Sequence, residues 1–161
     1  MITALDTNIL LDILVPGSAH EAASSARLDD AYAHGALIIC EAAHAELAGA
    51  FPSENELGRF LADTGIRMVP SGSHSLWLAG QRWRQYATRR PREVVCPKCG
   101  ARQSVRCERC GEPVKFRQHV LADFLIGAHA LLQADALLTR DRGFYRDYFR
   151  NLKIIDPSRP V

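Results

Sequence analysis

The sequence predicts an α/β domain with a doubly wound, mainly parallel sheet. Short apolar runs alternate with segments of helical periodicity along most of the 161 residues, which is the rhythm of parallel strands connected by helices. Hydrophobic residues make up 47% of the chain and charged residues 24%, which is enough apolar material for one ordinary core. A cysteine-rich segment interrupts the alternation once. We therefore expect one domain with an insertion rather than two full-sized domains.

Each expected element has a local reason in the sequence. Strands are expected at 2–5, 36–40, 66–69, 136–139 and 153–155. Helices are expected directly after Asp6, at 18–34, 41–51, 53–63, 73–89 and 118–134, and in the aromatic stretch 144–149. Gly35 and Gly65 end the helices that precede the second and third strands, and Ser53 with Glu56 three residues later has the spacing of a capping box. We expect three layers, α/β/α, with the strand order 3-2-1-4-5.

The same pattern sets the domain boundaries and the expected compartment. The domain should cover 1–156, interrupted by an insertion at 91–117 and followed by a tail at 157–161. Asp6 and Asn8 interrupt the first apolar run, which is not the pattern of a secretory signal. No run of about 18 apolar residues occurs, so a membrane-spanning helix is not expected. We therefore expect a cytoplasmic protein.

Basic residues are concentrated in one part of the chain. The formal net charge is only +2, but residues 82–117 contain 11 of the 20 lysines and arginines and only three acids. A basic segment on an otherwise acidic body is typical of a phosphate-binding surface, although an arginine-rich helix can also simply face water. The candidates for contact with nucleic-acid phosphates are Arg84, Arg89, Arg90, Arg102, Arg106 and Arg109.

Four of the five cysteines follow the spacing of a metal site. Cys96, Cys99, Cys107 and Cys110 form the pattern C-x2-C-x7-C-x2-C, with a glycine after each pair. Such pairs can turn two thiolates toward one ion, and the spacing predicts a closed structural Zn²⁺ site. Disulfides are the alternative, which a cytoplasmic setting disfavours. The remaining Cys40 ends an expected strand, where we expect a small buried apolar side chain.

Carboxylates stand at the carboxyl ends of two expected strands. Asp6 follows the first strand and Asp141 follows the fourth by two residues, while Glu46 and Asp123 interrupt mostly apolar helices. Each has an ordinary explanation by itself, as a helix cap, a turn former or a solvent-facing helix residue. Converging carboxylates would repel one another unless a divalent cation such as Mg²⁺ or Mn²⁺ compensates their charge.

Four motifs resemble those of PIN-domain nucleases, in the order expected for that family. They lie at Leu5–Asp12 (LDTNILLD), Ala45–Leu47 (AEL), Ala122–Ala130 (ADFLIGAHA) and Leu138–Phe144 (LTRDRGF). Each motif is short, and their combination is what makes the resemblance specific. The resemblance covers residues 1 to about 90 and 117 to 156, which is nearly all of the chain outside the cysteine-rich insertion.

This resemblance implies a PIN-like fold and a Mg²⁺- or Mn²⁺-dependent endoribonuclease. By position in the motifs, Asp6, Glu46, Asp123 and Asp141 would be the catalytic metal ligands and Asn8 and Thr139 the supporting groups. The chain also resembles VapC-type toxins, which dimerise and are silenced by an antitoxin encoded beside them. A homodimer, an RNA substrate and a cognate antitoxin are therefore expected. The zinc insertion departs from the usual compact toxin.

Other functions remain open at this point. A catalytically silent PIN fold could recruit RNA or a protein through its zinc knuckle, and a structure-specific DNA nuclease would use similar acids. The knuckle arginines Arg102, Arg106 and Arg109 could extend an RNA-binding surface, or the knuckle could contact a protein or brace the fold. A redox role for the cysteine pairs is remote. The pair His44 and Glu46 followed by Cys96 and Cys99 matches the zinc deaminase signature only imperfectly.

Overall fold

The molecule is built on a five-stranded parallel sheet. The structure is a computed structural model that describes residues 1–89, 93–96, 99–114 and 120–158. The sheet strands are β1 (Ile2–Leu5), β2 (Ala36–Ile39), β3 (Ile66–Met68), β6 (Ala136–Leu138) and β7 (Ile154–Ile155). Their order is β3-β2-β1-β6-β7, and every neighbouring pair is parallel. The predicted order, in which the first strand lies beside the fourth, is confirmed.

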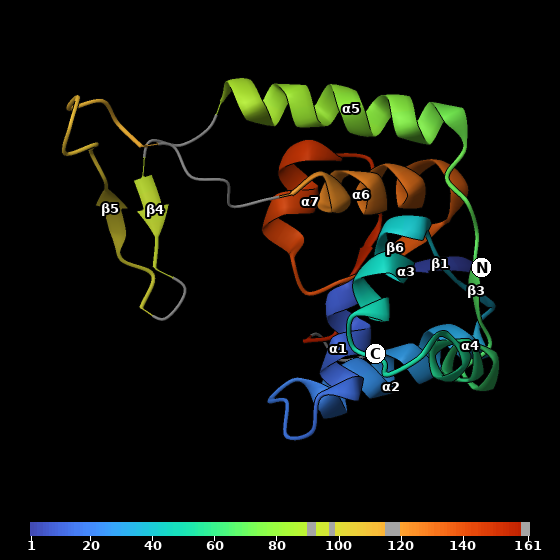
Figure 1. Cartoon of the computed structure of the whole chain (residues 1–161). Helices are drawn as coiled ribbons and strands as arrows, with labels where there is room; N and C mark the ends of the chain where they lie inside the picture. Colours follow the sequence, from blue (N-terminus) through green and yellow to red (C-terminus); the bar gives the residue numbers. More distant parts are fainter. Residues whose placement is uncertain (90–92, 97–98, 115–119, 159–161) are drawn as a thin grey trace.

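Helices cover both sides of this sheet. They are α1 (Thr7–Leu14), α2 (Glu21–Ala33), α3 (Glu41–Ala48), α4 (Glu54–Asp63), α5 (Ser73–Thr88), α6 (Leu121–Gln133) and α7 (Arg142–Tyr148). Figure 1 shows α5 lying along α6 on one side and α2 and α4 on the other. In the described part of the chain, no helix combines the length and the apolar character needed to cross a membrane.

Most helix boundaries agree with the sequence, and one difference has a clear cause. The Ser53 hydroxyl accepts a hydrogen bond from the Glu56 amide, so the predicted N-cap of α4 is confirmed. The helix expected from residue 18 begins only at Glu21, because the Ser18 hydroxyl instead donates to Asp12 and accepts from the His20 amide. The expected helix start at 118 lies outside the described residues.

The buried side of α6 carries an aromatic cluster that joins three helices. Phe124 is fully buried, and its ring lies 5.6 Å from those of Trp83 and Tyr86 on α5. On α7, the rings of Phe144 and Tyr148 lie 4.8 and 5.3 Å from the Phe124 ring. Edge and tilted contacts of this kind add to the burial of apolar area. They hold α7 in place, and α7 begins beside the carboxyl ends of the strands.

The cysteine-rich insertion forms a separate two-stranded hairpin. The strands β4 (Glu93–Val95) and β5 (Arg102–Ser104) pair antiparallel, and every residue of β5 is exposed. Figure 1 shows this hairpin standing away from the body, beyond the carboxyl end of α5. From the sequence we expected only turns, cysteines and charged residues here. Each strand of the hairpin has only three residues, which is too short to show the alternation of polar and apolar side chains that predicts a strand. The ends of the expected insertion, 91–92 and 115–117, lie outside the described residues.

Close packing at Gly127 gives a test of the fold. A Cβ at this position would lie 2.5 Å from Cε2 of the buried Phe149 ring. Changing Gly127 to alanine should therefore lower the free energy of unfolding by about 1–3 kcal/mol, measured by urea denaturation. The control is Gly80→Ala on α5, where a Cβ meets nothing within 4 Å and helix propensity should add up to about 1 kcal/mol. Equal stability of the two variants would contradict this packing.

Candidate active site

Asp6 is the most buried of the acids predicted for the site. It follows β1, and its amide donates to the Leu138 carbonyl at the end of β6, 3.0 Å away. Its exposed fraction is 6%. Asp6 occupies the N-cap position of α1, but its side chain makes no capping hydrogen bond. Helix capping therefore does not explain the carboxylate, and its oxygens are used in a tertiary network instead.

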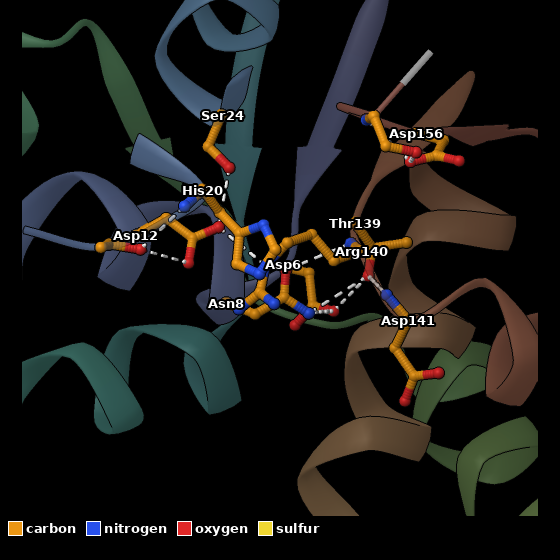
Figure 2. Close-up of polar contacts among 11 residues, drawn as sticks. Asp6, Asn8, Asp12, His20, Ser24, Thr139, Arg140, Asp141 and Asp156 are labelled. Carbon is orange, nitrogen blue, oxygen red and sulfur yellow. Dashed lines mark hydrogen bonds and ion pairs between the residues drawn. The ribbon is translucent and has the colours of Figure 1, made fainter. Parts of the chain in front are cut away.

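Thr139 and Asn8 hold the Asp6 carboxylate. The Thr139 hydroxyl donates to Asp6 Oδ2 over 2.6 Å, and the Asn8 amide donates to the same oxygen over 2.7 Å. The Thr139 oxygen also accepts from the Asp141 amide at 3.0 Å. Figure 2 shows this hydroxyl between Asp6 and the backbone that carries Asp141. Both residues predicted as supporting groups thus contact Asp6, and Thr139 connects two of the predicted acids.

Glu46 and Asp123 reach the same region from two other helices. The Thr7 hydroxyl donates to Glu46 Oε2, which places the exposed end of α3 beside the start of α1. Asp123 is half-buried in the first turn of α6, where its Oδ2 accepts from the Val120 amide at 2.8 Å. Glu46 itself is exposed. The apolar sequence around Glu46 therefore packs other faces of α3 and does not bury this acid.

Asp141 combines a local role with its place in the site. Its carboxylate accepts from the Phe144 amide at 3.2 Å and so caps α7. The side chain is exposed, and only one of its oxygens is used in this bond. Asp141, for which the ordinary explanation was a turn former before Gly143, is therefore the N-cap of a helix. Its other oxygen is left for contact with solvent or an ion.

The neighbouring acids alter the titration of Asp6 and Tyr145. Burial raises the pKa of Asp6 from 3.8 to about 6, the Thr139 hydrogen bond opposes this, and the charges of Asp123 and Glu46 raise it further. Burial also raises the pKa of the Tyr145 phenol, and the charges of Asp6, Asp123 and Asp141 raise it further. All four predicted acids therefore act on one small region around Asp6.

The described structure does not arrange these acids as a finished metal shell. Among the described residues, no three His, Cys, Asp or Glu side chains lie close enough together to hold one ion. The donor set nevertheless has the chemistry of a hard divalent cation, because it consists of carboxylate oxygens with a hydroxyl and an amide behind them. A desolvated carboxylate with other acids nearby is the electrostatic setting that a cation relieves.

A buried ion pair beside the site was not singled out from the sequence. Asp12 is 5% exposed, and its Oδ2 lies 2.7 Å from Nε of Arg140 and accepts from Ser24 Oγ, also over 2.7 Å. The Arg140 amide donates to Asn8 Oδ1 at 3.3 Å. Figure 2 shows Arg140 reaching from the β6–α7 loop toward Asp12. The pair holds the segment between Thr139 and Asp141 against α1. Asp12, the second acid of the Leu5–Asp12 motif, was the available signal in the sequence.

The predicted basic residues divide into two groups. Arg84 and Arg89 lie on or directly after α5 and are exposed, while Arg90 lies outside the described residues. On the hairpin, Arg106 donates to the Gly111 carbonyl at 3.0 Å, and Arg102 lies 3.9 Å from the Glu93 carboxylate. Those two arginines therefore serve partly to hold the hairpin together. Arg109 is exposed within the second cysteine loop.

The two cysteine pairs form loops of the same shape. Cys96 N–H donates to the Ala101 carbonyl at 2.9 Å, and Cys107 N–H donates to the Glu112 carbonyl at 2.9 Å. In each loop the glycine four residues after the first cysteine donates back to that cysteine's carbonyl. Gly100 and Gly111 adopt φ values of 71° and 73°, which an L side chain rarely adopts.

The surroundings of the cysteine side chains differ. None of the five cysteines is in a disulfide, and Cys40 is buried as predicted. Backbone N–H groups of Cys110 and Arg109, followed by the Cys110 side chain, lower the pKa of Cys107. Hydrogen bonds from the backbone to sulfur favour the thiolate, which is the form that binds a metal.

The raised pKa of Asp6 predicts a pH-dependent cost in stability. Below about pH 4 the carboxyl is protonated in both states and costs nothing. As the pH rises through 6, the folded state must hold a desolvated charge, so stability is lost, by up to about 3 kcal/mol. In a buffer with chelator, the Asp6→Asn variant should therefore have a higher free energy of unfolding than the wild type at pH 7. At pH 4 the two proteins should be equally stable, and urea denaturation measures both values. An equal gain for the exposed control Asp29→Asn would contradict this origin.

Comparisons with known proteins agree on the fold. No protein-family model and no curated protein matches the sequence. Among solved structures, the chain is similar to VapBC2 from Rickettsia felis bound to a promoter DNA fragment (15% identity, TM-score 0.59, covering 97% of this chain and 98% of the other). It is also similar to VapBC-1 from nontypeable Haemophilus influenzae (18%, 0.60, 99% and 100%) and to FitAB bound to the IR36 DNA fragment (19%, 0.59, 100% and 98%). The central parallel sheet and the helices on both of its sides therefore form a PIN-like α/β fold.

Proposed function

We propose that this chain is a metal-dependent endoribonuclease with its centre at Asp6, Glu46, Asp123 and Asp141. The observation that carries the proposal is the Asp6 carboxylate: it is buried, it is not used as a helix cap, and other acids raise its pKa. Keeping such a group costs stability, and function is the usual reason for retaining it. The PIN-like fold and the four motifs supply the reaction class.

The four acids would hold Mg²⁺ or Mn²⁺ at the carboxyl edge of the sheet. When bound, such an ion supplies positive charge for the attacking and leaving oxygens of a phosphodiester. Thr139 and Asn8 fix the orientation of the Asp6 carboxylate, because both donate a hydrogen bond to its Oδ2. Neither of them bonds to the other carboxylate oxygen. The exposed Asp141 and Glu46 leave the edge open to a nucleic-acid strand.

The partners follow from the same proposal. The solved structures most useful for comparison are VapBC and FitAB toxin–antitoxin complexes, which supports a cognate antitoxin as partner. We accordingly assign the chain to the toxin class of such pairs, acting on RNA in the cytoplasm as a homodimer. The hairpin distinguishes it from a compact toxin, and we place part of its substrate selection there.

Cleavage of a labelled RNA pool by purified protein tests the nuclease. We expect cutting with Mg²⁺ or Mn²⁺ that chelator abolishes, and Asp6→Asn or Asp141→Asn should reduce the rate at least about 100-fold because a ligand is lost. Thr139→Val, which removes only the supporting hydroxyl, should cost about 10–100-fold. Asp29→Asn is the matched control, since it removes an exposed carboxylate on α2.

The competing functions give different results in the same assay. A structure-specific DNA nuclease would cut DNA flaps and leave RNA intact, whereas a silent binding module would bind RNA in every buffer and cut in none. Metal-dependent cutting that survives both Asp6→Asn and Asp141→Asn would refute the assignment of these acids.

We propose further that Cys96, Cys99, Cys107 and Cys110 hold one structural Zn²⁺. Two loops of the same hydrogen-bonded shape support this, as do the two positive-φ glycines and the thiolate-favouring surroundings of Cys107. A closed set of four thiolates leaves no position for substrate, so this ion would stabilise the hairpin and take no part in catalysis. The described residues of the hairpin have few buried side chains, and metal binding would contribute most of its folding free energy.

Metal analysis of the purified chain tests the zinc site. We expect one zinc per chain, lost from Cys107→Ser and retained by Cys40→Ala, which removes the buried thiol outside the pattern. Because the hairpin stands away from the body, zinc removal should expose its backbone to proteolysis while the sheet keeps its urea midpoint. Zinc-free protein whose hairpin resists proteolysis as well as before would contradict the proposal.

A further inference from the structure

An arginine-lined cavity lies apart from the carboxylates, between α5, α6 and the end of α7. Its volume is about 440 Å³, and its lining includes Arg82, Gln85 and Arg89 from the α5 side and Asp147, Tyr148 and Arg150 from α7 and the residues after it. A second hollow of about 660 Å³ along α5 shares Arg82, Gln85 and Arg89 and adds Arg84. The two hollows are therefore neighbours along α5.

The cavity carries uncompensated positive charge. Its lining includes three arginines, Arg82, Arg89 and Arg150, and a single acid, Asp147. Within the part of the chain that the structure describes, none of these arginines forms an ion pair within 4.0 Å of an acid. Nε of Arg82 is buried and has no hydrogen-bond partner among the described residues. A buried unsatisfied donor is costly, and an anion in the cavity would satisfy it.

Neutral donors complete the lining. Burial raises the pKa of the Tyr148 phenol, and Tyr86 and Asp147 raise it further. The hydroxyl therefore stays protonated and can donate a hydrogen bond. The side-chain amide of Asn151 also lines the cavity. Guanidinium forks with neutral donors beside them suit an oxyanion with several acceptor oxygens, as a phosphate has.

The spacing along α5 favours a repeating polyanion over a single carboxylate. Arg82, Gln85 and Arg89 recur at helical spacing on one face, and Arg82 and Arg89 are separated by about 10 Å along the axis. Arg84 extends the basic surface into the neighbouring hollow. A row of cations matches successive phosphates of a nucleic-acid strand.

We propose that this cavity binds a backbone phosphate of the RNA substrate, away from the bond that is cut. The inference rests on the proposed function and adds a subsite to it. The α7 helix connects the two places, because it begins after Asp141 and ends at Tyr148, about 10 Å further on. The Tyr148 ring also contacts Phe124 at 5.3 Å, next to Asp123. A short stretch of strand can therefore span from the acids to the cavity.

Binding of a labelled single-stranded RNA in chelator tests this subsite without cleavage. The variant is Arg82→Gln with Arg150→Gln, and the matched control is Arg59→Gln with Arg67→Gln, which removes the same charge from exposed positions on α4 and β3. We expect the variant to bind the RNA more weakly. The slope of log K against log salt concentration should become shallower by about 0.7 for each lost phosphate contact, or by about 1.4 for both. The control should keep the wild-type slope.

The outcomes separate this inference from the proposed function. Equal slopes for the variant and the control, in a wild-type chain that binds and cuts RNA, would overturn the phosphate subsite alone. Loss of binding to a polyglutamate peptide with RNA binding unchanged would overturn it in favour of a protein carboxylate. A folded wild-type chain that neither binds nor cuts RNA would remove the proposed function itself. Urea denaturation of each variant checks that its fold is intact.

Discussion

The candidate site depends on the parallel pairing of β1 with β6. Leu5 lies opposite Leu138 in that pairing, so the next residues of the two strands, Asp6 and Thr139, emerge side by side at the carboxyl edge. The Thr139 hydroxyl then bonds both to the Asp6 carboxylate and to the Asp141 amide. In an open parallel sheet this edge is where ligands bind. A different neighbour for β1 would leave Asp6 as an isolated buried charge.

The site opposes part of the stability that the core provides. Burying Asp6 among other acids raises its pKa, and each such group weakens the folded state at neutral pH. The surrounding network limits this cost, because Thr139 and Asn8 donate to the carboxylate and the Asp12–Arg140 pair holds the loop that carries Asp141. A cation at the edge would remove the repulsion. Rigid positioning of acids that repel one another is the arrangement expected of a metal-dependent centre.

Two groups of arginines lie outside this centre, one at the cavity and one on the hairpin. The aromatic cluster on Phe124 fixes α5 and α7 to α6. The arginines of the cavity lie on α5 and directly after α5 and α7. The hairpin extends beyond the same end of α5 (Figure 1), so both basic regions lie toward the carboxyl edge of the sheet. Under the proposed function, the acids would hold cations for the reacting phosphate and the arginines would bind phosphates further along the strand.

The sequence by itself determined the strands of the main sheet, their order, most of the helices and the cysteine spacing. These depend on local periodicity, on short connections and on residues close in the chain, whereas the strands of the cysteine hairpin are too short to show such periodicity. Ser53 and Glu56 or the two cysteine loops can be recognised within a few residues. Only the tertiary structure decided which polar groups meet. Asp6 and Thr139 are 133 positions apart, and the partners of Asp12 and the cavity at Arg82 depend on how helices pack across the sheet. The burial of a side chain and the charge around it depend on residues that are far apart in the sequence, so no local pattern predicts them.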